Sequence, residues 1–440
     1  MSQENTSVPR RVVITGLGAV TPLGLTAAAT WKSLVEGRSG IGPITRFDPE
    51  GCPVNMAGEV REFDPTAPRG EIRPYGSGSE AVAAPLTPKD TRKFGRFIHL
   101  GLAAAMDAYA DSGLDGLRDQ LDPTRLGTNI GVGLGGLPEI EAMKETLDSG
   151  GYRRISAFFI IQTAPNILAG QAAILLNLRG PNYCIASACA TGGHSIGEAF
   201  RTILRGEADV MLAGGAESAV SPLGIGSFAR MRALSTRDDD PTRASRPFDA
   251  DRDGFVLSEG AVVAVLEDYE HAKKRGARIY AEVVGYGATA DAYHISSLAP
   301  EAEGSLRAMR LAMADARRDP SEIDCISAHA TSTPAGDVEE AVALARLLGE
   351  ARSRANVTAV KSMAGHMLGG AGALGAMAAI LAVHHGVVPP TINLDNPDPK
   401  CAETGLNFTP HTAQERSVRL ALANAYGFGG TNASVAFAAV

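Results

Sequence analysis

Cys189 lies in a setting that suits nucleophilic chemistry. Residues 182–188 before it are predicted to form an apolar strand, and residues 190–205 after it an amphipathic helix. A helix N-terminus stabilises a thiolate through its macrodipole and its free N–H groups. The same N–H groups can bind an oxyanion. The pattern equally suits a small buried cysteine that fills the end of a strand, and the sequence around Cys189 alone leaves both interpretations open.

Two histidines occupy similar positions at the ends of short predicted strands. His329 follows the strand predicted at 325–328, and His366 follows the strand predicted at 357–360 and opens a glycine-rich helix. In open α/β sheets, ligands gather beyond the carboxyl ends of the strands, where Cys189 would also lie. A single histidine is more often a hydrogen-bonded structural residue. Three such residues at three strand ends indicate that they converge on one site.

A glycine-rich segment at 427–430 surrounds Phe428. Glycines on both sides give the backbone freedom to move, so the aromatic side chain can swing. The backbone N–H of Phe428 could also serve as a second oxyanion donor. Since strands are predicted at 420–424 and 433–439, the segment equally suits a hairpin turn with a core phenylalanine.

Strands and helices alternate along the chain. The first part has strands predicted at 11–16, 128–133, 182–188 and 208–213, with helices at 26–36, 89–112 and 190–205. The second part has strands at 279–286, 325–328, 357–360, 420–424 and 433–439, with helices at 305–315, 338–348 and up to 385. The alternation predicts an α/β fold with a mostly parallel sheet covered by helices. The similar order of elements suggests two related halves, 10–277 and 278–440.

Composition excludes several other classes of protein. The chain has 440 residues, 45% of them hydrophobic and 20% charged, which argues against disorder. Its net charge of −8 argues against nucleic acid or an anionic membrane as a partner. The five cysteines are odd in number and widely spaced, which favours neither a disulfide framework nor a metal site. We see no apolar signal region at the start and no apolar run of 18 residues, and therefore predict a cytoplasmic protein that does not span a membrane.

The segments around Cys189, His329, His366 and Phe428 together resemble the elongating β-ketoacyl-acyl carrier protein synthases of type II fatty acid synthesis, most closely the type II synthase. The resemblance covers nearly the whole chain, and as a combination of motifs it is highly specific. It also includes the segments 13–22, 234–237, 243–249, 253–256 and 389–394.

The resemblance implies a thiolase-like fold, in which two βαβαβαββ halves form a five-layered α-β-α-β-α sandwich, and a homodimer. It places the nucleophile at Cys189, the catalytic histidines at His329 and His366, a conserved lysine at Lys361 and a gating phenylalanine at Phe428. The implied reaction is a decarboxylative Claisen condensation that lengthens an acyl chain by two carbons. It needs no metal or redox cofactor, because the substrates are carried on the phosphopantetheine of an acyl carrier protein that acts in trans.

Further positions match substrate and carrier contacts of the family. Thr331 and Thr333 match residues that bind the pantetheine arm, Leu134 and Phe228 match residues that shape the acyl pocket, and Ser296 is a further candidate for substrate binding. Because the carrier protein of this family is acidic, docking needs positive charge. The candidates are Arg153, Arg154, Arg232, Lys89, Arg92 and Lys93. The last three would lie with Arg96 on the helix predicted at 89–112.

Three departures bear on substrate specificity. Ala330 stands where the family usually has glycine, Tyr426 replaces a common phenylalanine and would add a hydroxyl beside the acyl tunnel, and residues 64–88 form a longer surface excursion than usual. These changes leave the reaction class intact. They leave open a synthase of a type II polyketide or other specialised acyl pathway.

Other members of the superfamily fit less well. A thiolase would need a second catalytic cysteine in the C-terminal glycine-rich loop, where this chain has Phe428 and no cysteine after Cys401. The initiating condensing enzymes would have asparagine in place of His366. A non-catalytic partner of the chain-length-factor kind would lack the nucleophile at Cys189.

Overall fold

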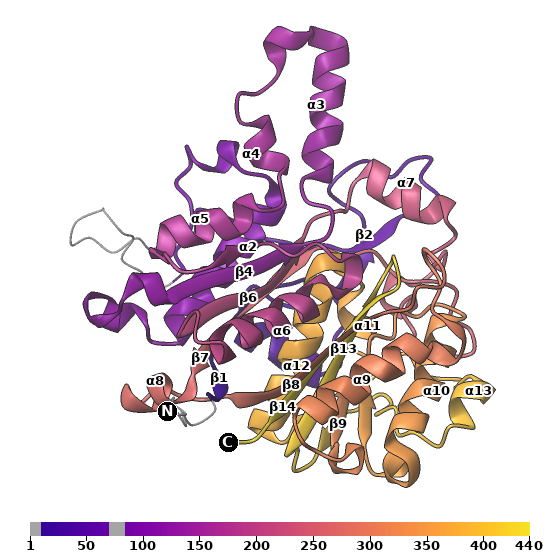
Figure 1. Ribbon diagram of the computed structural model, residues 1–440. Coiled ribbons are helices and arrows are strands. Elements are labelled where there is room, and N and C mark those ends of the chain that lie inside the picture. The colour runs from indigo at the N-terminus through magenta and orange to yellow at the C-terminus, as the bar shows by residue number, and fades with distance from the viewer. Residues whose placement is uncertain (1–9, 70–83) are drawn as a thin grey trace.

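The computed structural model describes residues 10–69 and 84–440. Within them, ten strands form one sheet in the order β10-β9-β13-β14-β8-β1-β7-β6-β4-β5 (Figure 1). Their bounds are β1 Val12–Val20, β4 Leu126–Val132, β5 Asn182–Tyr183, β6 Val210–Glu217, β7 Gly260–Asp268, β8 Ala281–Ala290, β9 Cys325–Ser327, β10 Asn356–Thr358, β13 Leu420–Gly427 and β14 Thr431–Ala438. Two small ribbons pair β2 (Ile41–Pro43) with β3 (Met56–Gly58) and β11 (Val387–Val388) with β12 (Gln414–Glu415).

The sheet consists of two five-stranded parts with the same topology. Numbered by order in the chain, the strands of each part lie across the sheet as 1-5-4-2-3, and the parts meet where β1 pairs with β8. In each part the second strand pairs in parallel with its neighbours, whereas the fifth strand is antiparallel to both of its own. The expected pair of βαβαβαββ halves is confirmed. The expectation of a mostly parallel sheet is wrong, because the last strand of each half runs antiparallel to both of its neighbours. One of these two strands, β7, was not among the strands predicted from the sequence.

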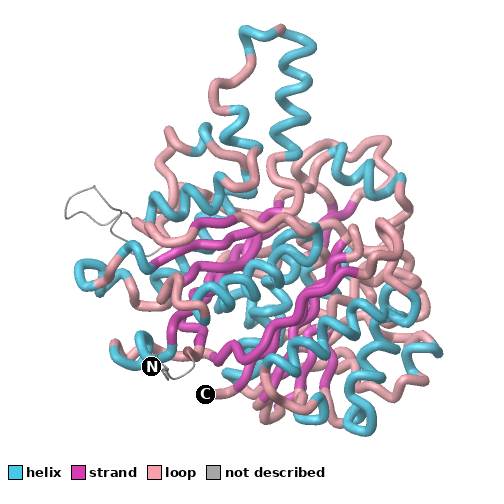
Figure 2. Tube along the Cα trace, viewed as in Figure 1, coloured by secondary structure: helices cyan, strands magenta, loops and turns pink. Residues whose placement is uncertain are grey.

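Helices cover both sheet parts and fill the space between them. Helices α2 (Arg96–Asp111) and α5 (Ile167–Leu176) pack on one outer face, α9 (Glu303–Asp315) and α10 (Gly336–Leu348) cover the other, and α6 (Thr191–Leu204) and α12 (Ala371–His385) lie in the middle. Figure 2 shows the two groups of strands with helices between them. The five layers of the α-β-α-β-α sandwich are therefore present as expected. The remaining helices are α1 Ala27–Val35, α3 Leu137–Gly150, α4 Phe159–Thr163, α7 Pro222–Arg230, α8 Tyr269–Lys274, α11 Lys361–Ala364 and α13 Pro399–Ala402.

The central helix α12 is apolar on all sides because it lies between the two five-stranded parts of the sheet. It approaches α6 closely: a Cβ added at Gly192 would lie 2.4 Å from the Ala373 nitrogen. Residues Leu368–His385 reach a mean hydropathy of 1.4 over 18 residues, long and apolar enough to cross a membrane by length and composition. The uninterrupted apolar run within it stops at Val383, before His384 and His385, so the window meets the length by its average hydropathy. Burial inside the fold accounts for the composition, since 89% of this window is covered.

Two predicted elements differ from the structure in ways that affect the site. The strand predicted at 182–188 ends at Tyr183, and the chain then turns through Ala188, whose φ of +49° lies in the left-handed region. The helix predicted at 89–112 begins only at Arg96, because Phe94 and Gly95 are extended. Lys89, Arg92 and Lys93 therefore do not share a helix with Arg96, and residues 70–83 of the expected excursion at 64–88 lie outside the described residues.

Candidate active site

A cavity of about 590 Å³ brings together side chains from both halves of the sheet. Cys189 enters it from the short turn before α6, His329 from the segment after β9, His366 from the segment between α11 and α12, and Phe428 from the loop between β13 and β14. The two imidazole rings meet edge to face with their centroids 5.6 Å apart. Residues more than 230 positions apart in sequence thus share one wall.

The thiol of Cys189 is only 7% exposed. Burial raises its pKa to about 12, and the carboxylate of Glu217 raises it further, whereas the charge of Lys361 and the N–H groups of Phe428 and Cys189 lower it. The expected thiolate is therefore not the resting form, because burial outweighs the groups that favour the charge. The two N–H groups beside the sulfur are nevertheless in place to hold an oxyanion.

His329 is held as a neutral ring with a defined tautomer. The backbone N–H of Tyr426 donates to its Nδ1 at 3.2 Å, so in the neutral ring the proton sits on Nε2. Burial lowers the pKa of His329 well below its usual value, with smaller contributions from Lys361 and His366. The ring is therefore a hydrogen-bond donor through Nε2.

Lys361 is almost fully buried beneath this histidine. Its ammonium donates a hydrogen bond to the carbonyl of His329. Burial lowers the pKa of Lys361 to about 8, although the nearby carboxylate of Glu340 acts to raise it. Glu340 in turn accepts the N–H groups of His329 at 2.8 Å and Ala330 at 2.6 Å. Burial raises the pKa of Glu340 to about 7.

His366 is anchored by its own backbone. Its N–H donates to the carbonyl of Val256 at 2.8 Å, and its carbonyl accepts the N–H of Ser258 at 3.0 Å. Its ring packs edge-on against Phe255, with centroids 5.2 Å apart. Burial and the charge of Lys361 lower the pKa of His366 well below its usual value. Both histidines thus enter the cavity uncharged.

The candidate substrate-binding residues all line the same cavity. Thr331 and Thr333 lie side by side, with their hydroxyl oxygens 3.2 Å apart. Phe228 packs edge-on against Phe255. Leu134 and Ser296 are exposed at the cavity wall.

The candidate docking residues fall in three separate places. Arg153 and Arg154 are exposed just after α3, which projects from the body of the molecule (Figure 1). Arg232 is exposed after α7 and lines the cavity. Lys89 and Arg92 are exposed before α2. The ammonium of Lys93 lies 2.6 Å from the Asp90 carboxylate, so its charge is already paired.

The departures from the family pattern are buried. Ala330 is 2% exposed and lines the cavity. The hydroxyl oxygen of Tyr426 is buried next to Ser305 and Asn424, without a hydrogen bond of good geometry among the described residues. Tyr426 itself lines the cavity, and its hydroxyl lies on the side of β13 that faces α9, so the hydroxyl beside the acyl tunnel stays a prediction.

Sequence reasoning missed three buried acids that line the cavity: Glu217, Asp337 and Glu340. All three accept backbone N–H groups of cavity loops. None stands in a distinctive local motif. The position of Glu340 on α10, a helix that follows His329 by a few residues, is the one feature that could have pointed to it.

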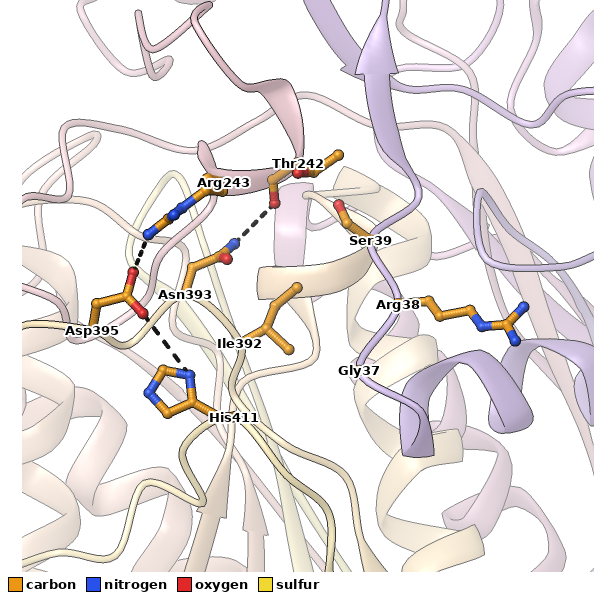
Figure 3. Close-up of a pocket in the computed structure, with 9 residues that line it drawn as sticks. All are labelled: Gly37, Arg38, Ser39, Thr242, Arg243, Ile392, Asn393, Asp395 and His411. Atoms are coloured by element: carbon orange, nitrogen blue, oxygen red, sulfur yellow. Dashed lines mark hydrogen bonds and ion pairs between the residues drawn. The ribbon is translucent and has the colours of Figure 1, made fainter.

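A second cavity, of about 600 Å³, lies away from these residues (Figure 3). Asp395 lies at the centre of two contacts in its wall: the Arg243 guanidinium is 2.5 Å from the carboxylate, and the His411 ring nitrogen is 4.0 Å from it. Arg38, which also lines the cavity, pairs with Glu36. Asn393 donates to the carbonyl of Thr242 at 3.0 Å. It shares no residue with the cavity around Cys189.

Two family models match the chain, and with its curated relatives they identify a condensing enzyme of the thiolase-like class, which transfers acyl groups. Residues 9–272 match the family description "Beta-ketoacyl synthase, N-terminal domain", and residues 280–395 match "Beta-ketoacyl synthase, C-terminal domain". The chain belongs to the beta-ketoacyl synthase family. The resemblance to the elongating type II synthases is thereby confirmed.

Relatives match over almost their whole length. The 3-oxoacyl-[acyl-carrier-protein] synthase 2 of Coxiella burnetii is 46% identical over 431 residues, which is 98% of this chain and 99% of that protein. Among solved structures, the ishigamide ketosynthase/chain length factor has a TM-score of 0.87 at 36% identity, covering 98% of this chain and 100% of that one. A type II PKS ketosynthase solved with its acyl-carrier protein has a TM-score of 0.85 at 31% identity, with the same coverage.

Proposed function

We propose that the protein lengthens an acyl chain held on Cys189 by two carbons, through decarboxylative condensation with malonyl-carrier, in type II fatty acid synthesis. The observation that carries this proposal is the single cavity in which a buried thiol faces two neutral histidines. The near full-length relatives named 3-oxoacyl-[acyl-carrier-protein] synthase 2 support the pathway.

In the first half-reaction, the sulfur of Cys189 adds to the thioester carbonyl of acyl-carrier. The N–H groups of Cys189 and Phe428 bind the oxyanion that forms. Collapse of this intermediate expels the pantetheine sulfur, which takes up the proton that Cys189 has lost. The acyl chain then remains on the enzyme as a thioester.

In the second half-reaction, malonyl-carrier loses carbon dioxide. The electron pair of the broken carbon–carbon bond stays on the remaining acetyl thioester and forms its enolate. Nε2–H of His329 donates to the enolate oxygen, and His366 provides the second hydrogen bond. The enolate carbon attacks the acyl thioester of Cys189. Collapse releases the lengthened β-ketoacyl-carrier and returns the thiol of Cys189 after it takes up a proton.

Lys361 and Glu340 position His329 in this scheme. The lysine holds the carbonyl of His329, and the glutamate holds the N–H of Ala330 in the same peptide unit, as well as the N–H of His329. Opposite charges on the two sides of one peptide restrict its rotation, so the ring stays in place when charge develops.

The same proposal covers the partners and the surroundings of the enzyme. We infer an acidic acyl carrier protein that acts in trans, docking at Arg153, Arg154 and Arg232, with Lys89, Arg92 and Lys93 as weaker candidates.

The exposed apolar residues beside α3 and α4, with the exposed edge strand β5, support a homodimer. The five free cysteines support a reducing cytoplasm. We infer no cofactor apart from the phosphopantetheine of the carrier, no nucleic acid and no membrane, and we place the division between halves at 277/278.

A ketosynthase of a type II polyketide pathway is the second candidate, favoured by the solved structures at 31–36% identity. The buried hydroxyl of Tyr426 and the methyl of Ala330 leave the reaction class intact in both cases. A non-catalytic chain-length factor is less favoured, because Cys189, His329 and His366 all face the cavity.

Intact-protein mass spectrometry tests the proposal. The enzyme is incubated with acyl-carrier thioesters of several lengths and with ring-containing donors, and malonyl-carrier is added afterwards. An acyl adduct on Cys189 that malonyl-carrier removes would support condensation, and a preference for straight chains would support fatty acid synthesis. A preference for polyketide-like donors would favour the second candidate, and the absence of any adduct would overturn both.

A further inference from the structure

Glu217, the last residue of β6, is a fully buried carboxylate at the wall of the active-site cavity. It accepts the backbone N–H groups of Gly133 at 3.0 Å, Leu134 at 3.0 Å and Gly135 at 3.1 Å. A fourth N–H, that of Gly369, lies 3.3 Å away. Three successive N–H groups that converge on an anion form a backbone nest. Here the anion is the protein's own side chain.

This carboxylate joins two neighbouring segments that lie far apart in the sequence. Residues 133–135 follow β4, and Gly369 belongs to the turn that begins two residues after His366. The segments fit closely: a Cβ at Gly369 would lie 2.5 Å from the nitrogen of Gly133, and a Cβ at Gly133 would lie 2.4 Å from a Glu217 oxygen. Neither segment can shift without losing hydrogen bonds to a buried charge, which is costly.

The charge of Glu217 does not help to form the nucleophile. It raises the pKa of the Cys189 thiol, which opposes ionisation. The purpose that its contacts indicate is to hold the main chain of Leu134, whose side chain is 48% exposed at the cavity wall.

We propose that Glu217 is a positioning residue that fixes Leu134 against the turn after His366 and thereby sets the length of acyl chain that the cavity accepts. This inference rests on the proposed function. A long chain depends on an ordered wall over its whole length, whereas a short one depends mainly on Cys189. Loosening Leu134 should therefore weaken the use of long donors more than that of short ones.

The test is Glu217→Gln, which keeps the shape of the side chain but replaces one acceptor oxygen with an NH2 group that faces other donors. The matched control is Glu59→Gln. Glu59 is likewise buried, with 2% exposure against 0% for Glu217, and accepts the backbone N–H groups of Thr45 at 2.9 Å and Arg46 at 3.0 Å, but it lies outside the cavity. We would measure kcat/KM and the acyl adduct on Cys189 with short, medium and long straight-chain donors.

For Glu217→Gln, we expect the ratio of kcat/KM for long over short donors to fall by about fivefold or more, and that of Glu59→Gln to stay within about twofold of the wild type. Equal ratios in the two variants would show that Glu217 has a structural role alone and would overturn the inference. If Glu217→Gln does not fold, Glu217→Asp keeps the charge but withdraws the oxygens, and an unchanged ratio there would overturn it equally.

The wild-type adduct separates this inference from the proposed function. If the wild-type protein forms no acyl adduct with any donor, the proposed function fails and the inference fails with it. If the adduct forms but the length profile of the Glu217 variants is unchanged, only the inference fails.

Discussion

The two halves of the sheet share a topology but contribute different chemistry to one cavity. In the N-terminal half, the chain leaves the third strand, β5, and presents Cys189 at the start of α6. In the C-terminal half, the chain leaves the equivalent strand, β10, and presents Lys361 and His366 before the equivalent helix, α12. Corresponding connections of the two halves thus carry the proposed nucleophile in one half and the residues proposed to stabilise negative charge in the other.

The loops after the second strand of each half also occupy equivalent positions and carry different side chains. A buried carboxylate holds each one by its backbone N–H groups: Glu217 holds the loop after β4, and Glu340 holds the segment with His329 after β9. Burial raises the pKa of both acids to about 7. One loop carries a side chain of the cavity wall and the other a hydrogen-bond donor. The repeated sheet therefore fixes where each loop lies, and the side chain that the loop carries fixes its contribution to the cavity.

The largest effect should come from removing the contribution of the N-terminal half. We expect Cys189→Ala to lower elongation by about a thousandfold or more, because no covalent intermediate can form. Thermal unfolding should barely change. Elongation rates and the unfolding midpoint are measured beside Cys184→Ala, a half-buried thiol outside the cavity. Elongation that persists in Cys189→Ala would rule out this nucleophile.

Removing the contribution of the C-terminal half should affect decarboxylation itself. Cys189→Gln, whose amide mimics an acylated thiol, is expected to decarboxylate malonyl-carrier without condensing it. In that background, His329→Ala or His366→Ala should lower carbon dioxide release by about 10²–10³-fold, because the enolate oxygen loses a donor. His99→Ala, outside the cavity, should not. Carbon dioxide release that is unaffected by either substitution would contradict the division of roles.

A smaller effect should come from the charge that holds His329. Because burial lowers the pKa of Lys361 to about 8, its ammonium is present below that pH and lost above it. Elongation should therefore fall as the pH rises through about 8. Lys361→Met should lower the rate by about tenfold at neutral pH and remove this limb from the pH profile. If Lys361→Met shows the same fall in elongation at high pH, that fall belongs to the titration of another group.

The smallest effect should come from Tyr426, the departure inside the C-terminal half. Its buried hydroxyl lacks a well-formed hydrogen bond, so Tyr426→Phe should leave the free energy of unfolding unchanged or raise it by about 1 kcal/mol. Denaturant unfolding measures this. Tyr286→Phe, which removes a hydroxyl bonded to Glu198, should lower stability by a similar amount. A clear loss of stability in Tyr426→Phe would mean that its hydroxyl has a partner.

Local pattern was enough to predict most of the elements and the segments around Cys189, His329 and Phe428. Apolar runs that end in glycine or small residues mark strand ends, and ligands gather beyond strand ends. Where the prediction failed, the competing influence was not local. Residues 184–188 are as apolar as a strand, but the chain must turn there to deliver Cys189 to α6.

The sequence by itself determined the fold class, the family and the residue types available for chemistry, because periodicity and motifs involve residues that are close together in the chain. Only the tertiary structure decided which groups are charged and what holds the loops. The thiol of Cys189 is neutral because it is buried, and Glu217 and Glu340 are important because distant backbone N–H groups converge on them. Burial and converging hydrogen bonds depend on segments far apart in the chain, and no local pattern encodes them.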